Sequence, residues 1–149
     1  MDRGKEAKEL QDFILQLMDA DNLILIKGNH EDVYEDLVTV DKGLPYEHHV
    51  YNGTYDTALQ LTGYEATWAQ IQNYDFADAA KRTPYYEKVI PSMIDYYETA
   101  HNIFVHGWIP CIADRRTGFS YYSDWRNVDA FEWKRARWHN GINVVQSCM

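Results

Sequence analysis

The sequence has few cysteines, and its basic residues are outnumbered by acidic ones. Cys111 and Cys148 are the two cysteines among 149 residues, too few for a disulfide-rich scaffold and typical of a reducing, cytoplasmic setting. Lys and Arg total 14 against 23 Asp and Glu, so the net charge is −9 with neutral histidine. This balance argues against a general nucleic-acid binder or an anionic-membrane binder, because both need a basic face. A small basic pocket on an acidic body remains compatible with it.

Long apolar runs are also absent. No segment approaches the roughly 18 apolar residues of a membrane-spanning helix, and no apolar core follows the charged N-terminus, as a signal peptide requires. A hydrophobic content of 46% and a charged content of 25% are typical of a globular protein. We therefore expect one acidic, soluble, cytoplasmic domain over residues 1–149.

Helical and strand patterns alternate along the chain, which predicts an α/β fold. Apolar residues recur at steps of three and four over 5–18 and predict a helix. The short apolar run 23–26 is typical of a strand buried in a parallel sheet. Residues 33–38 could begin a helix, and residues 41–54 are expected to form a loop. Residues 118–123 are expected to form either a loop or an edge strand. Further helices are expected at 56–61, 65–71, 76–81 and 128–138 and from Pro84, and strands at 93–98 and 103–106.

Polar side chains follow two of the predicted strands. Gly28-Asn29-His30-Glu31 comes after the run 23–26, and His106 ends the strand 103–106. Because the carboxyl ends of parallel strands meet at one edge of a sheet, we expect these side chains to share a site. An amide oxygen can bind a cation, and imidazole offers a ligand nitrogen or a proton that titrates near neutral pH. A strand-ending turn and a hydrogen-bonded structural histidine are the alternative interpretations.

The order of the motifs resembles that of the calcineurin-like metallophosphoesterases. Asp2-Arg3-Gly4, a helix and a strand, Gly-Asn-His-Glu at 28–31 and an apolar run ending in His106 are similar to the serine/threonine protein phosphatase branch of bacterial and phage type. The resemblance implies part of a two-sheet sandwich flanked by helices, with a helical insertion. It also implies hydrolysis of phosphate monoesters, on a phosphoprotein or a small phosphorylated molecule, by a metal-activated water.

The same resemblance implies roles for individual residues. Asn29 and His106 resemble ligands of one of two divalent ions, with manganese as the first expectation and iron or zinc as alternatives. His30 resembles the general acid that protonates the leaving oxygen. Asp2 resembles the carboxylate that pairs with His30 and orients its ring.

Two arginines resemble phosphate clamps, a task that suits the bidentate guanidinium. They are Arg3 in the N-terminal motif and Arg135 in a Trp-x-Arg sequence late in the chain. For Arg135, a basic patch on a helix shared with Arg137 is an equally good interpretation. Metals and arginines would make such a pocket positive inside a protein of negative net charge, so we expect a phosphorylated partner and neither nucleic acid nor membrane.

Two motifs of the family have no counterpart in the sequence. There is no Asp-x-His pair, and no Gly-His-x-His follows His106, so most of the family's metal ligands are missing. We therefore expect an incomplete phosphoesterase domain that binds two ions weakly or not at all. One alternative is a non-catalytic, truncated remnant or phosphate-binding module. Another is a diadenosine tetraphosphatase-like hydrolase, in which the aromatic-rich middle of the chain stacks a base.

Overall fold

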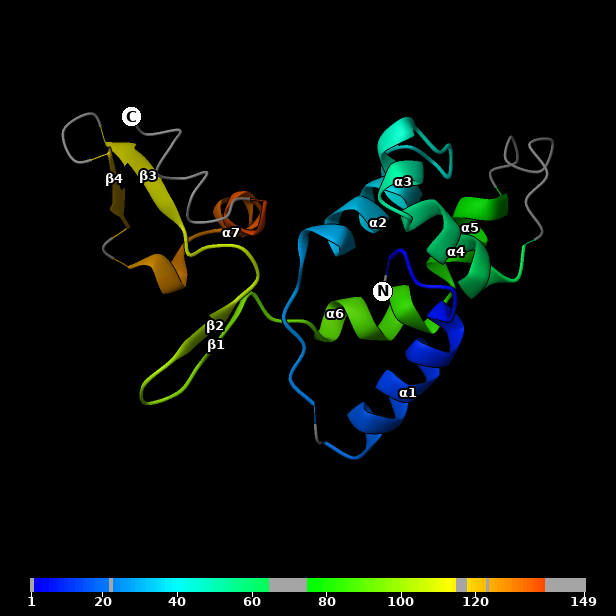
Figure 1. The fold of residues 1–149 in the computed structure, drawn as a ribbon, viewed down its shortest axis with the longest axis horizontal. Coiled ribbons are helices and arrows are strands. Elements are labelled where there is room, and N and C mark those ends of the chain that lie inside the picture. The colour runs from blue at the N-terminus through cyan, green and yellow to red at the C-terminus, as the bar shows by residue number, and fades with distance from the viewer. Residues whose placement is uncertain (1, 22, 65–74, 115–117, 123, 139–149) are drawn as a thin grey trace. The chain divides into compact units, whose positions relative to one another are not determined.

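The computed structural model describes residues 2–21, 23–64, 75–114, 118–122 and 124–138. The chain divides into two compact units (Figure 1). The first unit is Met1–Leu25 with His30–Met93, and the second is Ile26–Asn29 with Ile94–Met149. In the described residues, helices build the first unit, whereas short strands and one α-helix build the second, so the protein is mixed α/β. The expectation of a single domain stays a prediction. In the described part of the chain, no helix has the length and apolar character needed to cross a membrane.

Helices make up the whole secondary structure described for the first unit. They are α1 (Ala7–Asp19), α2 (Asn29–Thr39, whose first residue, Asn29, belongs to the second unit), α3 (Glu47–Tyr51), α4 (Thr54–Thr62), α5 (Asp75–Lys81), a π-helical turn η1 (Tyr85–Val89) and α6 (Ile90–Ser92). The helices predicted at 5–18, 56–61 and 76–81 are confirmed as α1, α4 and α5. The loop predicted over 41–54 is wrong in part, because α3 lies within it. The helix predicted at 65–71 falls outside the described residues.

The core of the first unit fixes α2, the helix that begins at the Asn-His-Glu sequence. Leu37 and Val38 of α2 are fully buried, and Tyr34 packs edge-to-face on Tyr85 of η1 with ring centroids 5.2 Å apart. Phe76 of α5 belongs to the same cluster. Helix α4 contacts α1, α3 and α5 (Figure 1). Burial of these apolar faces, rather than helix propensity alone, holds such short helices in place.

Among its described residues, the second unit contains two antiparallel strand pairs and one α-helix. Its elements are β1 (Tyr96–Glu98), β2 (Ile103–Val105), β3 (Cys111–Asp114), β4 (Gly118–Tyr121), a 3-10 turn η2 (Trp125–Asn127) and α7 (Ala130–Arg137). Strand β1 pairs with β2, and β3 pairs with β4. The strands predicted at 93–98 and 103–106 and the helix at 128–138 are confirmed, with shifted ends. Of the two options for 118–123, the strand is observed.

The buried parallel strand predicted at 23–26 is wrong. This run makes one isolated parallel bridge, from Ile26 to Ile94, and the side chain of Ile24 is 50% exposed. A continuous apolar run becomes a buried strand only where strands pair on its flanks and layers cover both faces. Asn29 and His106 therefore do not follow neighbouring parallel strands, since β2 pairs antiparallel with β1.

Aromatic stacking organises the second unit around α7. Tyr96 of β1 stacks on the buried Trp133 with ring centroids 5.3 Å apart, and Trp125 meets Trp133 edge-to-face at 6.0 Å. The amide of Trp108 donates to the carbonyl oxygen of Ala136 at 3.1 Å. This bond ties the segment that follows His106 to the end of α7.

Candidate functional site

In the first unit, the structure brings together Asp2 and His30, which are 28 residues apart in the sequence. The His30 Nδ1 atom lies 2.8 Å from Asp2 Oδ2. The Asp2 side chain is 5% exposed and the His30 side chain 31% exposed. Because a carboxylate can only accept, His30 Nδ1 carries the hydrogen, and Nε2 is the nitrogen left to exchange a proton with another molecule.

Asp2 has a second partner that the sequence did not predict. The hydroxyl of Thr54, the first residue of α4, donates to Asp2 Oδ2, the same oxygen that contacts His30. Thr54 is fully buried. The Asn-Gly sequence before it is a turn signal, but a contact over 52 residues leaves no local pattern in the sequence.

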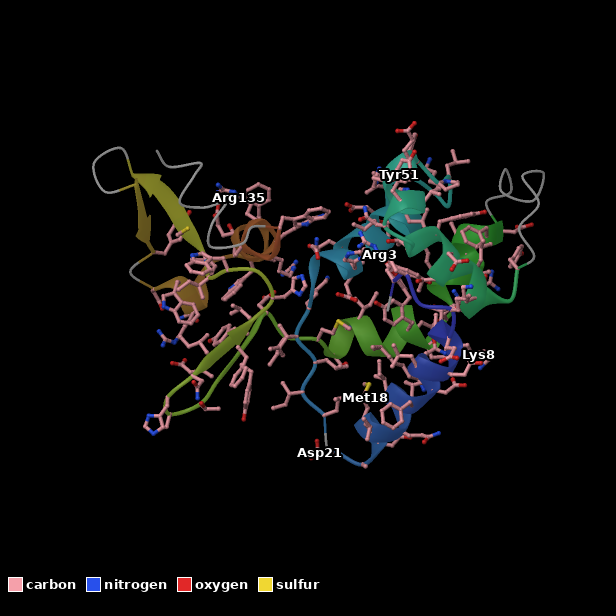
Figure 2. The ribbon with its side chains drawn as sticks, viewed as in Figure 1. Arg3, Lys8, Met18, Asp21, Tyr51 and Arg135 are labelled. Carbon is pink, nitrogen blue, oxygen red and sulfur yellow. The ribbon has the colours of Figure 1, made fainter. Side chains whose placement is uncertain are left out.

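Arg3 lies on the segment before α1 (Figure 2) and is exposed. Its backbone is left-handed, with φ of 68°, a conformation that a non-glycine residue seldom adopts. One guanidinium nitrogen, Nη2, donates to Asn52 Oδ1 at 3.4 Å. The amide partner is neutral, so the positive charge of Arg3 is not compensated by this bond and is available for an anion.

The glutamate of the Asn-His-Glu sequence is buried and anchors the start of α2. Glu31 is 8% exposed, and its Oε1 accepts a hydrogen bond of 2.7 Å from the Tyr85 hydroxyl. Burial, reinforced by the Glu31 charge, raises the pKa of Tyr85, so the phenol stays protonated and keeps donating. This bond fixes the first helical turn, on which Asn29 and His30 also lie.

In the second unit, the structure brings together the two predicted metal ligands. His106 Nε2 lies 2.9 Å from Asn29 Oδ1. His106 is exposed and Asn29 is partly buried. Two ligands at right angles on an ion with bonds of about 2.1 Å are about 3.0 Å apart, so this separation suits both a hydrogen bond and a shared divalent cation. The two residues thus fit two coordination positions and leave the others to water or to further ligands.

Arg135 lies on α7 (Figure 2) and already has an acidic partner. Its Nη1 atom is 2.9 Å from Oε2 of Glu132, one turn earlier on the helix. Arg137 is 6% exposed and paired with Asp95 at 2.6 Å, so an exposed basic patch shared by Arg135 and Arg137 is wrong. A phosphate at Arg135 would have to compete with the Glu132 carboxylate.

A second group of possible metal ligands lies around α3. Among the described residues, Asp41, His48 and His49 place one ligand atom each within 4.8 Å of the others. However, the amide of Tyr46 donates to His49 Nδ1 at 3.1 Å, which leaves the hydrogen of the neutral ring on Nε2. That Nε2 atom faces Asp41 Oδ2 at 3.3 Å. In this arrangement the neutral His49 ring has no lone pair for a cation.

Comparison of the chain with family models, curated proteins and solved structures gives no match. The metallophosphoesterase resemblance therefore stays a prediction that depends on the order of the motifs. The roles of Asp2, His30, Asn29 and His106 also stay predictions, although each pair is now seen in contact.

Proposed function

We propose that the protein is a metal-dependent phosphoesterase that hydrolyses phosphate monoesters on a phosphoprotein or a small phosphorylated molecule. The Asp2–His30 hydrogen bond carries the proposal. The resemblance assigned these two residues to the general acid and its orienting carboxylate. In the structure the carboxylate is shielded while the imidazole keeps access to solvent, as this division of roles requires.

The proton chemistry follows from the geometry of this pair. The leaving oxygen of a phosphate ester gains negative charge as its bond to phosphorus breaks, and a proton from His30 Nε2 neutralises that charge. The Asp2 carboxylate holds Nδ1–H and stabilises the imidazolium from which the proton leaves. General acid catalysis of this kind contributes roughly 10²- to 10⁴-fold in rate.

Arg3 is the proposed phosphate clamp, and Asn29 with His106 would hold a divalent ion. Such an ion would polarise the phosphate and make a bound water more acidic. We further propose manganese before iron or zinc, a cytoplasmic location without nucleic-acid or membrane partners, and a fold that is part of a two-sheet sandwich. The net charge of −9 supports the choice of partners.

The proposal is tested by hydrolysis of p-nitrophenyl phosphate and a phosphopeptide by the full chain with Mn²⁺. We expect Mn²⁺-dependent turnover that His30→Asn lowers roughly 10²-fold or more. The control is His101→Asn, which changes an exposed histidine in the turn between β1 and β2. Equal loss in both variants, or none in either, contradicts the role of His30.

One outcome favours the non-catalytic alternative. In this outcome the wild-type chain shows no Mn²⁺-dependent turnover, while inorganic phosphate still shifts the NMR signals of Arg3. That result would indicate a phosphate-binding module rather than an enzyme. The sequence observation behind this alternative is that only Asn29 and His106 match the family's metal ligands.

A further inference from the structure

We infer that Thr54, together with Asn52 and Gly53 before it, positions Asp2 and Arg3 in the proposed site. The catalytic meaning of this inference rests on the proposed function, but its geometry can be tested without turnover. All three residues contact the Asp2-Arg3 dipeptide from the beginning of α4, across about 50 residues of chain.

Thr54 fixes the Asp2 carboxylate. The Thr54 hydroxyl and His30 Nδ1 both donate to Asp2 Oδ2, and the side chains of Thr54 and Asp2 are buried or nearly so. A carboxylate that is shielded from water needs such donors to stay ionised. A hydroxyl held on one side of this oxygen leaves the other side for His30, so Thr54 determines which way Asp2 faces.

Gly53 allows α4 to approach the N-terminal segment closely. Its φ is 78°, and a Cβ built on it would lie 2.7 Å from the backbone nitrogen of Arg3. Any other residue here would therefore be strained in its own backbone and would also push Arg3 away. The close approach places the Thr54 hydroxyl within reach of Asp2.

Asn52 orients the Arg3 guanidinium, and its own amide is oriented in turn. The Asn52 Nδ2 atom donates to the carbonyl oxygen of His48 at 2.7 Å, which directs Oδ1 toward Arg3 Nη2 at 3.4 Å. Farther along α4, Gln60 holds the same N-terminal segment by bonds of 2.9 Å to Gly4 O and from Ala7 N. Helix α4 thus bonds to the N-terminal segment near both of its ends, and its first residue, Thr54, donates to Asp2 of the proposed proton-transfer pair.

The experiment compares Thr54→Val, which removes the hydroxyl but keeps the shape, with Thr54→Ser, which keeps the hydroxyl. In the full chain with ¹⁵N-labelled histidine, the ring nitrogen shifts of His30 report its tautomer at mildly alkaline pH, where free histidine is neutral. We expect the Nδ1–H form to predominate in the wild type and in Thr54→Ser, and to become the minor form in Thr54→Val. A purely structural threonine would leave the tautomer unchanged.

A folded Thr54→Val protein with the wild-type tautomer would overturn the inference. If Thr54→Val does not fold, the inference is tested on the wild-type protein by NMR. A slowly exchanging Thr54 hydroxyl hydrogen close to the Asp2 methylene group supports the inference, and the absence of such a hydrogen refutes it. Turnover separates this result from the proposed function. A shifted tautomer without wild-type turnover refutes only the enzyme, and turnover with an unshifted tautomer refutes only the role of Thr54.

Discussion

The two candidate pairs are held in different ways by their units. In the first unit, Asp2 is nearly buried and receives hydrogen bonds from both His30 and Thr54. In the second, His106 is exposed and contacts Asn29 through one hydrogen bond. A pair that transfers a proton needs a fixed orientation before the substrate arrives, whereas two ligands can be drawn into place by the ion that they bind.

The side chains around the Asp2–His30 pair are also more deeply buried than those around Asn29 and His106. The first unit buries apolar residues from α2, α5 and η1 in one cluster, whereas β2 of the second unit leaves Ile103 and Phe104 41% and 49% exposed. The difference indicates that substitutions in the helical core will disturb the Asp2–His30 pair more than comparable substitutions in the hairpin will disturb Asn29 and His106.

Truncation of the helical core gives the largest effect that we expect. Leu37→Ala removes a fully buried side chain from α2 and should lower the free energy of unfolding by about 2–5 kcal/mol. The matched change in the second unit is Phe104→Ala, at a half-exposed position, which should cost much less. Urea unfolding measures both, and equal losses would remove the contrast between the units.

Loss of the Tyr85 hydroxyl should have an intermediate effect. Tyr85→Phe removes the donor to buried Glu31 and should cost about 1–3 kcal/mol, because a buried charged acceptor loses a partner. Tyr97→Phe, at a 38% exposed tyrosine of β1, is the control and should be close to neutral. Urea unfolding midpoints report the difference. If Tyr85→Phe left the urea unfolding midpoint unchanged, Glu31 would not need this bond to anchor α2.

A smaller effect concerns pH and the buried His49 of the first unit. Burial lowers the pKa of His49, the neighbouring His48 acts in the same direction, and Asp41 and Asp36 oppose them. In the unfolded chain, histidine has a pKa of about 6.5. As the pH falls below that value, His49 binds a proton in the unfolded chain but not in the folded protein. The free energy of unfolding therefore decreases as the pH decreases.

Urea unfolding over a pH series checks this prediction. His49→Asn should flatten the slope below about pH 6.5 relative to the wild type, because the group with the lowered pKa is gone. An unchanged slope in His49→Asn would show that His49 does not titrate differently in the folded protein.

Periodicity predicted helix α1, whose apolar residues recur at steps of three and four, because that pattern is local, whereas α7 was predicted from its composition. The order of the motifs predicted which residues meet, as the Asp2–His30 and Asn29–His106 contacts illustrate. The strand at 23–26 was wrong because burial depends on neighbours that a local run does not encode. Helix α3 was missed because turn-forming residues flank it closely. The role of Thr54 could not be predicted, since it arises from a contact over 52 residues.

The most direct test of the central claim adds Mn²⁺ to the isotopically labelled chain and measures paramagnetic broadening residue by residue. Mn²⁺ favours oxygen ligands, and because it is paramagnetic it broadens the signals of nuclei close to it. We predict that the Asn29 side-chain amide and the His106 ring broaden first, and that His106→Ala abolishes this effect while His101→Ala does not. Broadening confined to His48 and Asp41, or unchanged by His106→Ala, would contradict the metal-dependent site.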